Sequence, residues 1–407
     1  MRISNQRYAN KPPGGLYLLG VMANELEAEG KTLIHMEIGQ PDFDSPAAAK
    51  EGAKQALDEG KVSYTDTAGI LPLRQAISEK ETAKGHHYDP VHEIVVTSGA
   101  SEALSAIFLT MLEPGEEVLC LSPYYADYPE IIKLSGGKIK EVPVELHDRW
   151  VVNTELLEKS LSEKTKLILI NNPNNPCGYN LSRENLEAIA AFAIKNDLPV
   201  ISDECYEELV YSGAHLSIAL LPGMRARTLV VKSMSKAYSM TGWRLGYAMG
   251  PAPLVNNVLN GHYAISTSSA NFPQWGALEA VRHGSAFTAE LVAEFKRRNE
   301  YMYERLKAVP GVRIAKPEGS MFLFPDISAF GLEDKAFCEY LMKEAGVVAA
   351  PGSIFGAAGI GHIRLAYCVP FDQIVQATDA IIIALGKLKL QQQPEEGKAA
   401  GRTDKQP

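Results

Sequence analysis

The twelve residues Ser233 to Arg244 read SMSKAYSMTGWR, and their chemistry predicts the fold. A lysine bonds covalently to a carbonyl compound only when its amine is neutral, and a phosphorylated ligand needs hydroxyl and guanidinium donors around its oxygens. Lys236 offers the amine, while Ser233 and Arg244 offer the two kinds of donor. The stretch therefore predicts a site for a phosphorylated carbonyl compound.

This stretch has two other interpretations. Ser233 to Lys236 fits the S-x-x-K pattern of penicillin-recognising serine enzymes, but the accompanying S-D-N and K-T-G tripeptides are absent from the sequence. A lysine and an arginine eight positions apart can also be two solvated surface charges. The motifs in the rest of the chain decide in favour of the ligand site.

A second group of polar side chains follows the apolar run 198–202, which predicts a buried strand. Functional groups of open α/β sheets lie at the carboxyl ends of such strands. Asp203 can pair there with a protonated ring nitrogen, and Tyr206 can donate to a ring hydroxylate. Asp203 can equally be the N-cap of a helix, and the residues alone leave both interpretations open.

The apolar run 167–170 leads into residues 171–178, which read NNPNNPCG and form a turn or loop by composition. The amide of Asn175 can donate to a ring oxygen of a cofactor and to a substrate carboxylate. An ordinary Asn-Pro turn without a ligand is the alternative.

Small residues follow the strand expected at 93–97, where Ser98 to Leu104 read SGASEAL. At a strand-to-helix junction, small residues let backbone N–H groups approach a phosphate, and the helix dipole favours the anion. A capping box with Ser98 as the N-cap is the alternative. Both interpretations place the start of a helix here.

Together these four separated motifs resemble the class I/II aminotransferase family of fold-type I pyridoxal phosphate enzymes, from about Ile38 to Val369. The resemblance implies pyridoxal 5'-phosphate, bound covalently by Lys236, with Asp203 and Tyr206 as catalytic residues at the ring nitrogen and ring oxygen. Tyr125 would stack on the ring. The other cofactor-binding residues that it implies are Ala100, Ser101, Asn175, Ser233 and Arg244.

The resemblance also implies how the substrate and a second subunit bind. Arg364 matches the arginine that grips the substrate α-carboxylate in a bidentate fork, although an arginine in a strand pattern often faces solvent. Gly39 matches the glycine whose backbone lies beside that carboxylate, and Asn175 also contacts the substrate. Tyr64 matches a tyrosine that reaches the phosphate of the neighbouring subunit, so we expect a homodimer.

The order of the apolar runs predicts an α/β fold, because strand-like runs alternate with helical stretches as in a mostly parallel sheet covered by helices. By resemblance, this sheet has seven strands. We expect a large cofactor-binding domain at 47–284, a small α+β domain from 1–46 and 285–390, and a disordered tail at 391–407. A long helix after 285 is expected to expose its charged residues, which are Glu294, Lys296, Arg297, Arg298 and Glu300.

Composition excludes several classes of protein. The chain has 407 residues and a net charge of −9, which argues against a nucleic-acid partner. Its five cysteines have no C-x-x-C spacing and indicate reduced thiols and a cytoplasmic location. The sequence has no cluster of histidines and cysteines with metal-ligand spacing, so we expect no metal site. No apolar run is long enough for a signal peptide or a membrane span.

The sequence thus predicts transfer of an amino group between an L-amino acid and a 2-oxo acid, 2-oxoglutarate or pyruvate, in amino acid metabolism and biosynthesis. An apolar wall formed by Leu16, Tyr17 and Tyr124 favours aromatic or aliphatic donors. A C–S β-lyase is the main alternative, because the same chemistry at the α-carbon serves both. A non-catalytic regulator is a second alternative. Because the resemblance begins by about Ile38, we expect no DNA-binding domain in front of it.

Overall fold

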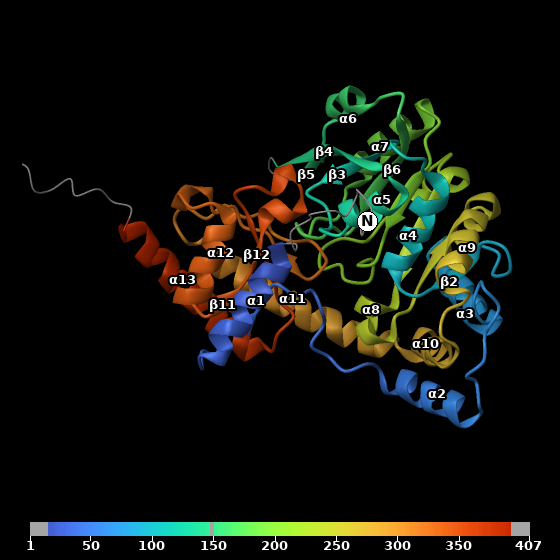
Figure 1. Cartoon of the computed structure of the whole chain (residues 1–407), viewed down its shortest axis with the longest axis horizontal. Coiled ribbons are helices and arrows are strands. Elements are labelled where there is room, and N and C mark those ends of the chain that lie inside the picture. The colour runs from blue at the N-terminus through green and yellow to red at the C-terminus, as the bar shows by residue number, and fades with distance from the viewer. Residues whose placement is uncertain (1–14, 147–149, 392–407) are drawn as a thin grey trace, which may run out of the picture.

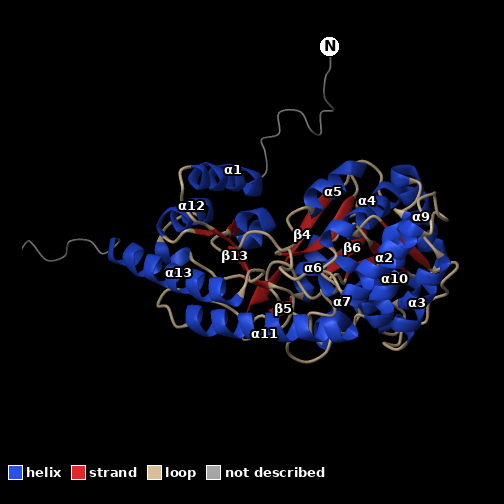
Figure 2. Ribbon diagram, turned by 90° about the horizontal axis from the view of Figure 1, so that it is seen from below, coloured by secondary structure: helices blue, strands red, loops and turns tan. Residues whose placement is uncertain are grey.

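The chain builds two unequal parts that lie side by side (Figures 1 and 2). The structure is a computed structural model that describes residues 15–146 and 150–391, with side chains from Leu19 to Leu388. The predicted tail therefore lies outside the described residues, apart from Gln391. The larger part contains one wide sheet, and the smaller part contains both the first and the last described helices.

The wide sheet is mostly parallel, as predicted. Strand β9 is antiparallel to both of its neighbours, β2 and β8, and β5 is antiparallel to β4, whereas the pairs from β8 to β4 are parallel. In spatial order the strands are β2 (Ile94–Thr97), β9 (Gly246–Met249), β8 (Thr228–Ser233), β7 (Val200–Asp203), β6 (Thr165–Asn171), β3 (Glu117–Ser122), β4 (Lys138–Leu146) and β5 (Trp150–Val152).

The prediction of seven strands is corrected to eight. The additional edge strand β5 has only three residues and pairs with the end of β4, with Val144 opposite Val152. A strand this short is below the length at which alternation of apolar and polar residues can be recognised. Only tertiary pairing with β4 identifies it.

Helices cover both faces of this sheet because its strands are apolar on both sides. In β6, Leu167 and Leu169 pack into one core with α4, α5 and α9, whereas Ile168 and Ile170 pack into another with α6 and α7. The helices of this part are α2 (Ala47–Asp58), α3 (Leu71–Thr82), α4 (Ala100–Met111), α5 (Tyr128–Ser135), α6 (Thr154–Ser160), α7 (Arg183–Lys195), α8 (Met234–Ala237), α9 (Ala252–Ser266) and α10 (Asn271–His283).

The smaller part joins the beginning of the described chain to its end. β1 (Ile34–His35) pairs in parallel with β11 (Val347–Val348), so the N-terminal segment packs against C-terminal elements. A second small sheet is antiparallel and has the order β10 (Phe322–Leu323), β13 (Ile363–Ala366), β12 (Ala350–Pro351). Its helices are α1 (Gly15–Ala28), α11 (Ser285–Lys307), α12 (Asp334–Glu344) and α13 (Phe371–Gln391). In the part of the chain that is described, no helix combines the length and apolar character that crossing a membrane requires.

One charged residue of α11 is not on a solvated face as predicted. Arg298 is only 4% exposed, while its neighbours Lys296, Arg297 and Glu300 are exposed. Its guanidinium donates to both carboxylate oxygens of Asp42, at 2.7 and 3.1 Å. It also donates to Glu294 at 2.9 Å and to the carbonyl of Tyr367 at 3.2 Å. Arg298 thus ties α11 to the segments that contain Asp42 and Tyr367.

We predict that Arg298→Ala lowers the free energy of unfolding by about 3 kcal/mol, because it removes a buried guanidinium together with its hydrogen bonds to Asp42, Glu294 and the carbonyl of Tyr367. Arg297→Ala is the control on the adjacent, exposed residue and should have little effect. Chemical denaturation followed by circular dichroism measures both. Equal effects of the two substitutions would contradict this account of Arg298.

Candidate active site

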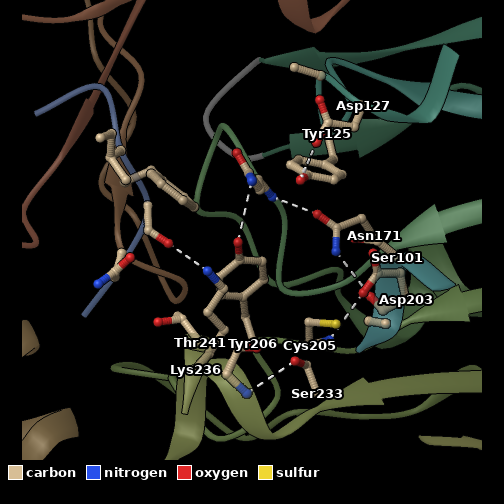
Figure 3. A pocket seen from close by; sticks show the side chains of 18 of the residues that line it. Ser101, Tyr125, Asp127, Asn171, Asp203, Cys205, Tyr206, Ser233, Lys236 and Thr241 are labelled. Atoms are coloured by element: carbon tan, nitrogen blue, oxygen red, sulfur yellow. Dashed lines mark hydrogen bonds between the residues drawn. The ribbon is translucent and has the colours of Figure 1, made fainter. Parts of the chain in front are cut away.

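A cavity of about 520 Å³ opens at the carboxyl ends of the parallel strands and is lined by residues of both parts of the chain. Figure 3 shows side chains from β6, β7 and β8 pointing into it. The cavity is lined by eleven of the twelve predicted site residues, which are Gly39, Ala100, Ser101, Tyr125, Asn175, Asp203, Tyr206, Ser233, Lys236, Arg244 and Arg364. Segments far apart in the sequence therefore converge as predicted.

Lys236 lies in the short helix α8, directly after β8. The side chain of Ser233 caps this helix by accepting from the N–H of Ser235 at 3.1 Å. The amine of Lys236 donates to the carbonyl of Gly39. Burial disfavours the ammonium form and lowers the pKa of Lys236 from the ordinary lysine value. The chain thus presents an amine with an increased neutral fraction inside the cavity.

Asp203 ends β7 and has a carboxylate buried beneath the cavity. Its Oδ2 accepts from the hydroxyl of Tyr128 at 2.5 Å and its Oδ1 from the N–H of Cys205 at 3.2 Å. Burial raises the pKa of Asp203. Among the described residues no cation forms an ion pair with it, and its hydrogen-bond partners are Tyr128 and Cys205. No helix begins at Asp203, which removes the N-cap interpretation, since a turn follows instead.

A chain of hydrogen bonds crosses the cavity floor, and Figure 3 shows the part between Asn171 and Asp203. Arg364 donates to Oδ1 of Asn175 at 3.0 Å, and Nδ2 of Asn175 donates to the hydroxyl of Tyr206 at 3.3 Å. The backbone N–H of Asn175 donates to Asn171 at 2.7 Å, and Asn171 donates to the carbonyl of Asp203 at 3.1 Å. The loop that contains Asn175 is thereby fixed to β7, so it is not a free turn.

Arg364 is buried rather than solvent-facing. Its guanidinium lies 4.5 Å from the ring of Phe322 and 4.8 Å from that of Phe355, and it donates to the carbonyl of Glu37. Its Nε has no hydrogen-bond partner within the part of the chain that the structure describes. Burial lowers the pKa of Arg364. A buried, positively charged planar fork that has no carboxylate partner among the described residues is suited to an anionic ligand.

The opposite end of the cavity is built for a second anion. Helix α4 has Gly99 as its N-cap, with a φ of 92° and no side-chain hydrogen bond, so the proposed capping box at Ser98 does not form. A Cβ on Gly99 would lie 2.7 Å from the guanidinium of Arg244. The small residue thus lets Arg244 approach the first turn of α4, whose free N–H groups favour an anion. Ser101 and Ser233 add hydroxyls beside it.

Gly39 and Tyr125 line the remaining walls. A Cβ on Gly39 would lie 2.6 Å from the ring of Phe322, so the close contact that requires glycine is with this aromatic ring. Tyr125 presents its ring to the cavity, and its hydroxyl donates to Asp127 at 2.5 Å. Its ring also packs edge-on against Tyr128, with centroids 5.5 Å apart.

The structure does not place every predicted residue at the cavity. Tyr64 is 85% exposed and does not line it. The predicted wall residue Tyr124 is also absent from the lining, because its side chain turns to Glu141 and donates to it at 3.0 Å. Leu16 and Tyr17, the other wall residues, lie outside the described side chains.

Several lining or supporting residues were not assigned from the sequence. Tyr128 holds Asp203, Asn171 holds Asn175, and Phe322 packs on Arg364. Asp127 brings a carboxylate to the cavity. Tyr128 and Asp127 stand in the same PYYADYP segment as Tyr125, but their roles depend on contacts with other elements that no local pattern reveals.

A buried ion-pair cluster holds the strands that supply Asp203 and Lys236. The amine of Lys232 lies 2.6 Å from carboxylate oxygens of both Glu81 and Glu207. Glu204, Glu207 and His215 bring ligand-type atoms within 4.8 Å of one another. Because Lys232 pairs with Glu207 and His215 lies 3.1 Å from Glu204, these groups are accounted for without a metal ion.

Comparison with known proteins gives a consistent result. The family model "Aminotransferase class I and II" matches residues 31–381. The chain is 39% identical to aromatic-amino-acid aminotransferase 2 of Thermococcus litoralis, covering 88% of this chain and 93% of that protein. It is 38% identical to aspartate aminotransferase of Pyrococcus abyssi, and the match covers 90% of this chain and 95% of that protein.

Solved structures agree with these relatives. A double mutant of Thermus thermophilus aspartate aminotransferase superposes with a TM-score of 0.89 at 34% identity, covering 94% of this chain and all of that one. The aromatic aminotransferase of Pyrococcus horikoshii superposes with a TM-score of 0.85 at 37% identity, and the match covers 91% of this chain and 100% of that one.

The lowered pKa of Lys236 predicts unusual reactivity towards aldehydes. Below the ordinary lysine pKa of 10.5, a larger fraction of Lys236 than of an exposed lysine is neutral, so it should react faster at near-neutral pH. Lys54 is the internal control, since its hydrogen bond with Glu51 raises its pKa. Reductive methylation of cofactor-free protein with formaldehyde, mapped by mass spectrometry across pH, measures both. Slower labelling of Lys236 than of Lys54 at every pH would contradict the prediction.

Proposed function

The chain belongs to the class I and II aminotransferases, and from this premise we propose that its cavity binds pyridoxal phosphate and transfers amino groups between an L-amino acid and a 2-oxo acid. The observation that carries the proposal is the convergence of Lys236, Asp203 and Arg364 in one cavity. The named relatives are aminotransferases, which favours transfer over the β-lyase alternative.

The residues present fit the cofactor. Asp203 is a buried carboxylate that lacks a cationic partner among the described residues, and a protonated ring nitrogen would supply one. Asn175 and Tyr206 would hold the ring oxygen, and Tyr125 would cover the ring face. The phosphate would be held by Ala100, Ser101, Ser233 and Arg244 around the first turn of α4. When bound, pyridoxal phosphate withdraws electrons from the substrate α-carbon.

The chain's own groups then bind the substrate and move a proton. Arg364 holds the α-carboxylate through its free Nε and its remaining donors, and Asn175 orients the guanidinium. Lys236, whose burial favours the neutral amine, accepts the proton of the α-carbon at Nζ and later returns it. The stacked walls of Phe322 and Phe355 keep water from the guanidinium, which strengthens its attraction for the carboxylate.

The lining favours amino donors with uncharged side chains. Among the described residues, the cations that line the cavity are Lys236, Arg244 and Arg364, and each already has a partner in the proposed complex. The remaining surface includes the apolar side chains of Ile38 and Leu104 and the carboxylate of Asp127. A second carboxylate on the substrate would meet no further cation and would be repelled by Asp127. Aromatic or aliphatic donors meet neither penalty.

We also propose that Tyr64 acts in the neighbouring subunit of a homodimer. Its side chain is 85% exposed, and the side chain of Val62, two positions earlier, is 69% exposed. A tyrosine this exposed contributes nothing to the cavity of its own chain. An exposed apolar surface of this kind is suited to contact with a second copy.

We predict that kcat/KM for aromatic or aliphatic donors exceeds that for aspartate by about tenfold, since a like-charge contact that costs about 1.4 kcal/mol in the transition state lowers kcat/KM by that factor. A donor panel with pyruvate or 2-oxoglutarate as acceptor measures this, with separate detection of the oxo acid and of ammonia. Lys236→Ala is the control, which should stay folded and lose turnover. Faster transfer from aspartate than from every uncharged donor would overturn the substrate assignment, and full activity of Lys236→Ala would overturn the mechanism.

For Tyr64, we predict that Tyr64→Ala weakens cofactor binding by about tenfold, because one charge-assisted hydrogen bond to the phosphate is lost. Titration of cofactor-free protein measures the affinity, and sedimentation measures the assembly. Hybrids of Tyr64→Ala with Lys236→Ala subunits should recover one site of normal affinity and activity, because that site combines an intact Lys236 with the partner's intact Tyr64. Hybrids that keep the defect would place Tyr64 in its own subunit's site.

A further inference from the structure

One carboxylate joins the two parts of the chain next to the cavity. Glu141 lies on β4 in the larger part, and its Oε2 accepts from the hydroxyl of Ser122 at 3.0 Å. The same oxygen accepts from the N–H of Ala357, in the smaller part, at 2.9 Å. Oε1 accepts from the hydroxyl of Tyr124 at 3.0 Å. Glu141 thus binds the end of β3 and a loop more than 200 positions away in the sequence.

The loop that Glu141 holds connects β12 to β13 through two short helices, Gly352–Phe355 and Ala357–Gly359. A second contact fixes it, because the N–H of Tyr124 donates to the carbonyl of Phe355 at 3.0 Å. Gly356 lies between the two short helices and has a φ of 101°. A Cβ on this residue would lie 2.9 Å from Oε2 of Glu141. The loop therefore approaches the carboxylate as closely as glycine allows.

Both ends of this contact lead directly to the site. Tyr124 precedes Tyr125, whose ring faces the cavity. Phe355 packs on the guanidinium of Arg364, whose Cζ lies 4.8 Å from the centre of the Phe355 ring. A rigid link between Tyr124 and Phe355 therefore sets the spacing between the wall that would cover the cofactor ring and the guanidinium that would hold the substrate carboxylate.

We propose that Glu141 is a positioning residue for substrate binding, which fixes Arg364 relative to Tyr125 by tying the loop after β12 to the end of β3 and the middle of β4. The proposal rests on the proposed roles of Arg364 and Tyr125. Glu141 does not line the cavity, so it acts through these two residues. Of the proposed cofactor-binding groups, Tyr125 is coupled to Glu141 through its neighbour Tyr124. The charged groups Lys236, Asp203 and Arg244 lie on elements that take part in none of the hydrogen bonds of Glu141 among the described residues.

This division between substrate and cofactor groups predicts a selective kinetic effect. Glu141→Ala removes three hydrogen bonds to a charged acceptor, and the loop then loses its fixed position. We expect KM for both the amino donor and the oxo acid to rise about tenfold while kcat changes by less than about threefold, because the α-carboxylate contact is present in the ground state and the transition state alike. Cofactor affinity of the cofactor-free protein should change by less than about threefold.

Two further variants separate positioning from general stability. Glu141→Gln should restore most of the affinity, since Oε1 can accept from Ala357 and Ser122 while the hydroxyl of Tyr124 turns to accept from Nε2. Tyr124→Phe removes only one of the three contacts and should raise KM by a smaller factor in a protein that still folds. Glu117→Gln is the matched control, because Glu117 accepts from Ser162 at the other end of β3, remote from the loop.

Direct binding of 3-phenylpropionate, which has a carboxylate and no amine, reports on Arg364 without turnover. Its dissociation constant should rise with KM in Glu141→Ala and in Tyr124→Phe, and stay unchanged in Glu117→Gln. Unchanged KM and binding in Glu141→Ala and in Tyr124→Phe, beside an active wild type, would overturn the role of Glu141 alone. Absence of transamination in the wild type would instead overturn the proposed function.

Discussion

The cavity depends on the buried carboxylate of Asp203 at the end of β7. Taking such a group out of water is costly, and the fold offsets part of the cost with the hydroxyl of Tyr128 and the N–H of Cys205. It offers no cation among the described residues, and burial raises the pKa of the carboxyl as a consequence. The site is therefore preorganised for a ligand that brings a positive charge, and the positions of Lys236 and Arg364 define where the rest of that ligand lies.

The two parts of the chain contribute different functions to this site. In the proposed function, the wide sheet supplies the groups for the cofactor from neighbouring strand ends, and the ion pairs of Lys232 hold these strands together from within the core. The smaller part supplies Arg364 from β13. Its position relative to the sheet is set by contacts between the parts, of which those of Glu141 lie beside the cavity. In the proposed function, substrate affinity therefore depends on the junction between the two parts, whereas most of the cofactor contacts come from the larger part.

Much of this site could be predicted from sequence because its groups follow recognisable strands. Asp203, Lys236 and Asn175 each stand within a few residues of an apolar run, and parallel strands bring their carboxyl ends to one edge. What escaped prediction depends on partners far away in sequence. The sequence around Arg298 is typical of a solvated helix face, and its burial depends on the ion pair with Asp42, 256 positions away. Tyr128 donates a hydrogen bond to Asp203, 75 positions away in the sequence, and the side chain of Tyr124 binds Glu141 and does not line the cavity. The three-residue strand β5 is defined by its pairing with β4 alone.

The visible absorption spectrum of the purified protein tests the central claim most directly. The protein loaded with pyridoxal phosphate is recorded alone, after adding an amino acid, and after adding a 2-oxo acid. We expect an absorption band that depends on Lys236, that an uncharged amino donor bleaches, and that the oxo acid restores. A protein that cannot be loaded with pyridoxal phosphate, or a band that persists while pyruvate and ammonia accumulate, would contradict this expectation.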